Sequence, residues 1–122
     1  MNTMTEEDLK WIDKLIVCCK EVKNVLCRFG DNPLIFQRDK DYQRSIMMLC
    51  VKIGEIFSNC LSNHAKDVFC DLGWKRFVWL RHRCVHFKNS EINIYEVWFY
   101  VHIDIPNLLE RLEIEKINYA CF

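Results

Sequence analysis

The residues whose types could do chemistry gather between residues 72 and 90. Aromatic side chains alternate there with basic ones. Basic side chains can hold phosphates, and aromatic rings can stack on bases. A basic run is otherwise a solvated face, and Trp74 and Phe77 also fit a stripe that faces the core. The segment contains no acidic residue, and its basic residues, histidines and aromatic residues are Lys75, Arg76, Arg81, Arg83, Lys88, His82, His86, Trp74, Phe77, Trp79 and Phe87.

Arg81 and His86 form an arginine followed by four residues and then a histidine. On an ideal helix two such residues are about 140° out of phase, so they point apart unless the helix ends between them. His86 could instead cap a helix C-terminus as an imidazolium. His82 and His86, four residues apart, could also chelate a metal. No glutamate lies between these histidines and arginines flank them, so we expect neither a metal nor another cofactor.

Basic and acidic residues are unevenly distributed along the chain. The chain has 17 basic and 17 acidic residues, and this neutrality would argue against a nucleic-acid partner. Five of the basic residues and none of the acidic ones lie in residues 72–90. The remainder therefore holds 12 basic and 17 acidic residues, a difference of −5. We expect a basic cleft on an otherwise acidic protein.

The first element that must support this segment is a long helix over residues 5–29. Thr5 is its predicted N-cap, and Asp8 stands at the capping-box distance. Its apolar positions recur every three or four residues and form a face wide enough for two neighbours, as in a bundle. Residues 30–33 contain Gly, Asp, Asn and Pro and should break the helix.

A second helix is expected from residue 39 or 41 to residue 63. Gly54 lies inside it, and because a glycine there costs roughly 1 kcal/mol relative to alanine, it suggests a close helix contact. Glu55 follows and is either a solvated side chain or a buried partner for a cation.

A third helix is predicted over 74–85 or 74–86, after a turn at Gly73. Ser90 could cap a fourth helix, in which Pro106 should produce a kink or a restart. No segment resembles a strand. The pattern predicts an all-α fold, an antiparallel bundle of four to five helices with short connections.

Length and composition indicate a single helical domain over residues 1–122. The apolar content of 51% excludes a disordered chain, and no apolar run approaches the ~20 residues of a membrane span. The polar, acidic first ten residues do not resemble a secretory signal, so we expect a cytoplasmic protein without a membrane partner. The eight cysteines contain no Cys-x-x-Cys pair, and we interpret them as reduced and mostly as small core residues.

Over residues 41–112 the sequence resembles the HEPN superfamily, specifically the small HepT-like ribonuclease toxins of prokaryotic toxin–antitoxin pairs. The resemblance is carried by an ordered series of motifs rather than by one short pattern. In this sequence they are Ile53-Gly54-Glu55, Trp74, Leu80-Arg81, His86, Glu96-Val97-Trp98 and Asp104-Ile105-Pro106-Asn107-Leu108.

The resemblance implies a metal-independent endoribonuclease that cuts RNA through the ribose 2′-hydroxyl, with the motif at a homodimer cleft. His86 would then transfer a proton, and Arg81 would stabilise the phosphate charge of the transition state. His82 would orient the phosphate or assist proton transfer. The remaining cations, Arg83, Lys88, Lys75 and Arg76, would bind substrate. A nucleotidyltransferase-type antitoxin would be the protein partner.

Two positions depart from the family pattern. His82 stands where another polar residue usually follows the motif arginine, and Lys88 stands where HepT proteins commonly carry a tyrosine that the antitoxin nucleotidylates. The second departure puts control through a tyrosine adduct in doubt. It leaves an alternative open: a non-catalytic helical subunit that binds nucleotide or RNA and partners a nucleotidyltransferase. A metal-sensing protein that uses its cysteines is a third possibility.

Overall fold

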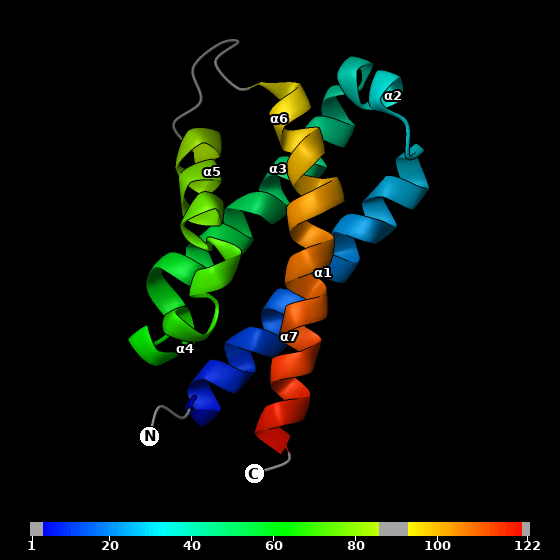
Figure 1. Cartoon of the computed structure of the whole chain (residues 1–122). Coiled ribbons are helices and arrows are strands. Elements are labelled where there is room, and N and C mark those ends of the chain that lie inside the picture. Colours follow the sequence, from blue (N-terminus) through cyan, green and yellow to red (C-terminus); the bar gives the residue numbers. More distant parts are fainter. Residues whose placement is uncertain (1–3, 86–92, 121–122) are drawn as a thin grey trace.

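A computed structural model describes residues 4–85 and 93–120 of the chain, and within these residues every regular element is helical (Figure 1). This confirms the all-α prediction. The elements are α1 (Glu6–Phe29), α2 (Pro33–Arg38), α3 (Lys40–Glu55), the π-helix η1 (Ile56–Cys60), α4 (Asn63–Val68), the 3₁₀ turn η2 (Cys70–Leu72), α5 (Lys75–Val85), α6 (Ile94–Phe99), the π-helix η4 (Tyr100–Asp104) and α7 (Ile105–Ala120).

Long helical rods alternate in direction through the described part of the chain. In Figure 1, α1 ascends, α3 descends into η1, α5 ascends, and α6, η4 and α7 descend together. The strongest packing is between α3 and α5, and α1 packs against both α3 and α7. The wide apolar face of α1 therefore does have two neighbours, as its periodicity predicts.

The start of α1 follows its sequence signals. Thr5 is the N-cap: its Oγ1 accepts a hydrogen bond from Asp8 N at 3.0 Å, and its own N donates to Asp8 Oδ2 at 3.1 Å. The carboxylate of Asp8 also accepts hydrogen bonds from Ser62 N at 2.9 Å and Ser62 Oγ at 2.6 Å. One buried carboxylate therefore joins the start of α1 to the start of α4, a long-range link that the sequence did not reveal.

Two short helices, α2 and α4, were not predicted, because neither is long enough to show an apolar period. Each nevertheless begins at a local capping signal. Asn32 Oδ1 accepts a hydrogen bond from Leu34 N at 2.8 Å, with Pro33 at the first helical position. Ser62 Oγ accepts one from Ala65 N at 3.2 Å.

Pro106 interrupts the last rod, as predicted. It lacks the N–H that would continue the α-helical pattern, and the chain widens just before it into the π-helix η4. There Ile105 N donates to the carbonyl oxygen of Tyr100, five residues back. The predicted cap Ser90 lies outside the described residues. Asn93 caps α6, and its Oδ1 accepts from Tyr95 N at 3.0 Å.

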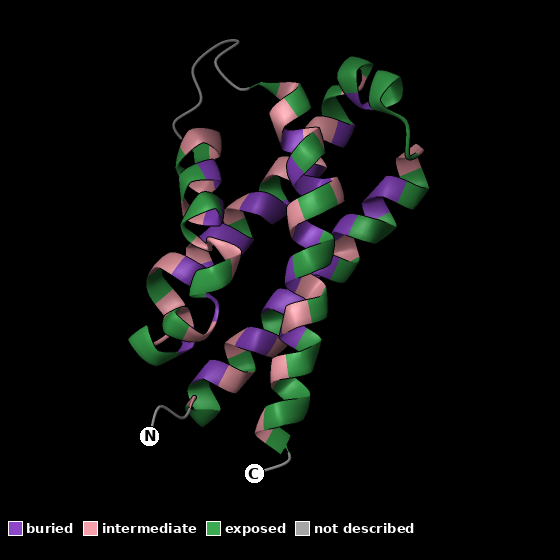
Figure 2. Cartoon of the chain, in the orientation of Figure 1, coloured by how far each residue is buried: buried purple, intermediate pink, exposed green. Residues whose placement is uncertain are grey.

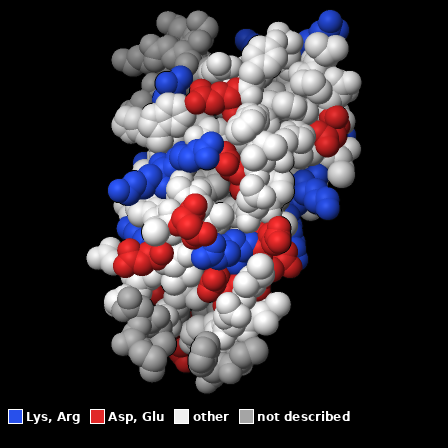
Figure 3. Space-filling view, viewed as in Figure 1, with Lys and Arg blue, Asp and Glu red and all other residues white. Residues whose placement is uncertain are grey.

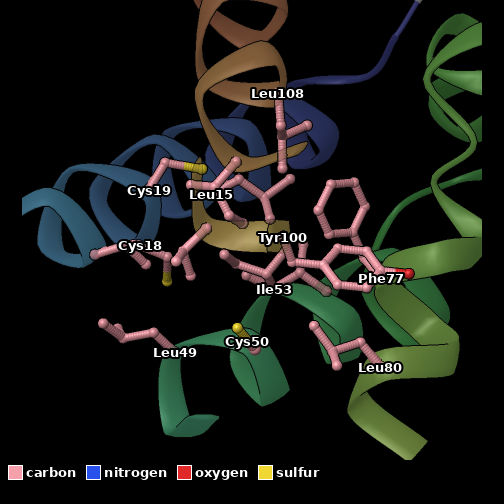
Figure 4. Close-up of a cluster of buried hydrophobic side chains, with 14 of the residues drawn as sticks. Leu15, Cys18, Cys19, Leu49, Cys50, Ile53, Phe77, Leu80, Tyr100 and Leu108 are labelled. Atoms are coloured by element: carbon pink, nitrogen blue, oxygen red, sulfur yellow. The ribbon is translucent and has the colours of Figure 1, made fainter. Parts of the chain in front are cut away.

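The core lies where the rods face one another, and buried residues line these faces in Figure 2. Figure 4 shows Leu15 of α1, Ile53 of α3, Phe77 of α5 and Leu108 of α7 converging there. No helix in the described part of the chain combines the length and hydrophobicity of a membrane span.

The cysteines divide between core and surface. Cys18, Cys19 and Cys50 are buried and fit the core interpretation, whereas Cys27 and Cys70 are exposed and are not core residues. Burial raises the pKa of the Cys19 thiol to about 12. Such thiols stay protonated near neutral pH and behave as small apolar groups.

Candidate functional site

The site begins at a close crossing between α3 and α5. Gly54 has no side chain at the contact, and a Cβ built there would lie 2.5 Å from the carbonyl oxygen of Phe77 and closer still to Cβ of Arg81. Real Cβ atoms do not come that near to other heavy atoms. The glycine therefore lets the two backbones approach, as its position inside a helix predicts, and it places the root of the Arg81 side chain against α3.

Glu55, the residue after Gly54, forms an ion pair with Arg81. Glu55 Oε2 lies 2.6 Å from Arg81 Nε, although the Nε–H bond is not directed at that oxygen. Glu55 Oε1 accepts a hydrogen bond from Asn59 Nδ2 at 2.9 Å, which orients the carboxylate. The side chain of Glu55 is 45% exposed and that of Arg81 27% exposed. Glu55 is thus a cation partner, but at the rim of the core rather than inside it.

Arg81 keeps donors for an external anion. The contact with Glu55 is made through Nε, and among the residues that the structure describes the two terminal Nη groups make no hydrogen bond. A guanidinium that is held by one edge and partly exposed can present its planar N–H groups to a phosphate. The arrangement can therefore bind an oxyanion at the junction of α3 and α5.

Arg76 lies on a different side of α5. Its Nη2 is 3.3 Å from Asp104 Oδ2, and its guanidinium carbon is 5.4 Å from the ring centroid of Tyr100. The Asp104 side chain is only 12% exposed, and burial raises its pKa, an effect that the nearby Arg76 partly offsets. Arg76 therefore ties α5 to η4, and the structure does not bring it to Arg81.

Lys75, His82 and Arg83 occupy the outward side of α5 together with Trp79. Lys75 and His82 are exposed, and Arg83 Cζ lies 4.9 Å from the ring centroid of Trp79. Figure 3 shows basic side chains over α5, at the left of the view. The predicted substrate-binding residues are thus divided among different faces of one helix.

His86 and Lys88 lie outside the described residues, and α5 is described only as far as Val85. The distance between Arg81 and His86 therefore stays a prediction. So does the location of the motif at a helix end.

The aromatic residues of the basic segment have separate roles. Phe77 is buried, and its ring stacks on Phe57 at a centroid distance of 5.7 Å. Trp74 stacks on the other side of this cluster, 6.1 Å from the same Phe57 ring. Both belong to the core-facing stripe that the periodicity indicates. Phe87 lies outside the described residues, and Trp79 is exposed.

Arg111 of α7 supports the connection that leads into α5, and sequence reasoning missed it. Its Nη1 lies 2.6 Å from Asp71 Oδ2, its Nη2 donates to Val68 O at 2.7 Å, and its Nε donates to Glu115 Oε1 at 3.1 Å. The hydrogen bond from Arg111 holds the pKa of Asp71 below its ordinary value. Only the contact with Glu115, four residues away, has a signal in the sequence.

A groove of about 610 Å³ lies elsewhere, between α1 and α7, and none of the predicted site residues lines it. His102 and Asp31 lie at one end of it. His102 Nε2 is 2.7 Å from Asp31 Oδ1, and His102 Nδ1 is 2.8 Å from the carbonyl oxygen of Trp98. This histidine joins the α1–α2 connection to the last rod.

Within the described residues, no group of three or more His, Cys, Asp or Glu side chains could hold a metal ion. Comparisons of the chain with models of known protein families, with curated proteins and with solved structures find no match. The resemblance to HEPN proteins therefore depends on the motifs in the sequence alone.

Proposed function

We propose that this protein is a HepT-like, metal-independent endoribonuclease toxin that acts as a homodimer in the cytoplasm and is neutralised by a nucleotidyltransferase-type antitoxin. One observation carries most of the proposal: two motifs of the resemblance, Ile53-Gly54-Glu55 and Leu80-Arg81, meet at the crossing of α3 and α5. Gly54 permits the approach, and Glu55 holds Arg81. A purely architectural bundle does not need a half-exposed ion pair at such a contact.

In the proposed reaction the ribose 2′-oxygen attacks the adjacent phosphorus. A base removes the 2′-hydroxyl proton, the bond from phosphorus to the 5′-oxygen breaks, and that oxygen leaves with a proton. The products are a 2′,3′-cyclic phosphate and a 5′-hydroxyl end. His86 is the proton-transfer group, because imidazole titrates near neutral pH. Arg81 stabilises the charge that develops on the phosphate.

In this mechanism Glu55 is a positioning residue. It contacts the Nε edge of Arg81 and leaves the Nη groups for phosphate. Asn59 fixes the carboxylate in turn. His82 on the outward side of α5 remains a candidate for phosphate orientation, whereas Arg76 is committed to Asp104 and Tyr100 and contributes to folding.

The second candidate is a non-catalytic subunit that binds nucleotide or RNA and partners a nucleotidyltransferase. It is favoured by Lys88 at the position of the family tyrosine, and by the ion pair that already neutralises Arg81 in the free protein. In that case Arg81 binds an anion without reacting.

The test is incubation of the purified protein with defined single-stranded RNA in the presence of EDTA. We expect cleavage with cyclic-phosphate ends, a decrease of about 10²–10³ in kcat for Arg81→Ala, and one of about 10²–10⁴ for His86→Ala. Arg44→Ala is the matched control, because Arg44 is an exposed arginine of α3 that pairs with exposed Asp41. Cleavage that survives both active-site variants contradicts the site. If the purified protein is dimeric and cuts no RNA, the result favours the non-catalytic subunit.

A further inference from the structure

Trp79 is the one exposed tryptophan among the four of the chain, all of which lie in the described part. It is 42% exposed. Trp11, Trp74 and Trp98 instead pack against the core, where Trp74 stacks on Phe57 and Trp98 lies 5.2 Å from the ring of Phe36. Trp79 is therefore less well accounted for by core packing than the other three tryptophans.

Cations flank this ring along one side of α5. Lys75, Trp79 and Arg83 are spaced four residues apart, which stacks them as one stripe on the helix surface. The guanidinium of Arg83 lies 4.9 Å from the centroid of the Trp79 ring, and His82 is exposed beside it. No acidic residue occurs anywhere in residues 72–90. The stripe therefore combines one flat apolar ring with positive charge on both sides.

This combination matches a ligand that is both planar and anionic. Phosphates are attracted by lysine and arginine, and an unpaired base offers a π-face to an aromatic side chain. An acidic peptide would use the charges but not the ring. Base pairs of a duplex are already stacked and are closed to such a ring.

We propose that Lys75, Trp79 and Arg83 form a stacking site for an unpaired base of single-stranded RNA, with the neighbouring phosphates against the two cations. The choice of RNA rests on the proposed ribonuclease function. Trp79 and Arg81 are two residues apart, about 200° around the helix, so the stripe lies on the far side of α5 from the ion pair with Glu55. It holds nucleotides that flank the cleaved bond, and it contributes to KM rather than to kcat.

The test is binding of the intact protein to a short single-stranded 2′-O-methyl RNA, whose 2′-oxygen cannot attack. A second oligonucleotide carries abasic positions and keeps every phosphate. We expect Trp79→Ala to weaken binding to the intact strand about ten-fold, which is within the range for loss of one stacked base. Trp79→Phe should retain most of the affinity. The abasic strand should bind wild type and Trp79→Ala equally.

Two controls separate stacking from charge and from surface effects. Tyr95→Ala removes another exposed aromatic, 62% exposed on α6, and should leave RNA affinity unchanged. Lys75→Ala should weaken binding to the intact and abasic strands alike. It should also reduce the slope of log binding constant against log salt concentration by about one, because one phosphate contact is lost, whereas Trp79→Ala should leave that slope unchanged.

Each outcome either supports or overturns the proposal. Equal affinity of wild type and Trp79→Ala for the intact strand overturns it, and so does an equal loss on duplex RNA. It is also overturned if Trp79→Ala dissociates a dimer in sedimentation, because the ring is then an interface residue. If Trp79 governs binding but no RNA is cut, the ribonuclease proposal fails and the stacking site stands. If cleavage requires Arg81 and His86 while Trp79→Ala leaves KM unchanged, only the stacking site fails.

Discussion

Arg81 of α5 and Glu55 of α3 form an ion pair of 2.6 Å across a helix crossing at which Gly54 leaves no room for a side chain. Glu55 directly follows Gly54 in α3. The close approach of α5 at the glycine therefore also brings Arg81 within reach of the glutamate. A motif of three consecutive residues thus supplies both the close approach and the partner for the arginine.

Gly54→Ala should destabilise the protein although alanine is the better helix former. The added methyl group overlaps Arg81 and the carbonyl oxygen of Phe77, so α5 must shift. Overpacking of this kind costs about 1–3 kcal/mol, which the helix propensity of alanine, roughly 1 kcal/mol, offsets only in part. Urea denaturation measures the change. Met48→Ala, at a 64% exposed position of the same helix, is the control and should change the free energy of unfolding little.

Glu55→Gln should reduce ribonuclease activity more than it reduces stability. The amide keeps the size of the side chain and loses the charge that orients Arg81. Because Glu55 is 45% exposed, the ion pair should contribute about 0.2–1 kcal/mol to the free energy of unfolding. A double-mutant cycle with Arg81→Ala measures this coupling. A ten-fold or larger loss of kcat with unchanged KM would support a positioning role, and equal activity of variant and wild type would argue against it.

Asp8 should make the stability of the protein fall in acid. Burial alone would raise its pKa, but the hydrogen bonds from Ser62 and Thr5 together outweigh burial and lower the pKa below 3.8. The folded state therefore releases this proton more readily than the unfolded state. The stabilisation is complete well above pH 3.8 and is lost as the pH falls through the lower, folded pKa.

Asp8→Asn should accordingly cost about 1–3 kcal/mol at neutral pH and less in acid. Denaturant titrations between pH 2 and pH 7, a range chosen to span this transition, measure the difference between wild type and variant. Asp104→Asn is a control whose effect on the free energy of unfolding should change with pH in the opposite direction, because burial raises the pKa of Asp104 and disfavours its charged form. A pH-independent difference for Asp8→Asn would contradict the assignment.

Arg111→Lys should loosen the connection that leads into α5. Lysine retains the charge but not the planar group that reaches Asp71, Val68 and Glu115 together. We expect a loss of about 1–3 kcal/mol. Faster amide hydrogen exchange should appear in η2 and the start of α5. Arg28→Ala removes a 3.9 Å pair with Glu21 and a contact with the ring of Phe29, both at the end of α1 and away from this connection, and should leave both measurements unchanged.

Local sequence was sufficient for much of the fold. Thr5 and Asp8 predict the start of α1 because a capping box depends on residues three apart. Pro106 predicts the interruption of the last rod because a missing N–H acts at its own position. Gly54 predicts a close contact because a glycine inside a helix carries an energetic penalty. Each of these signals acts over less than two helical turns.

Long-range packing was needed to assign the cations of α5. They look alike in the sequence, yet Arg81 reaches Glu55, Arg76 reaches Asp104, and Lys75 and Arg83 flank Trp79. The role of each depends on which side of the helix turns toward α3 and η4, and that is set by the packing of Phe77 and Leu80 into the core. Arg111 reaches Asp71 and Val68 only when segments about 40 residues apart are brought together. Side-chain type and spacing therefore identify the chemistry available to α5, while the contacts of the folded chain assign that chemistry to individual residues.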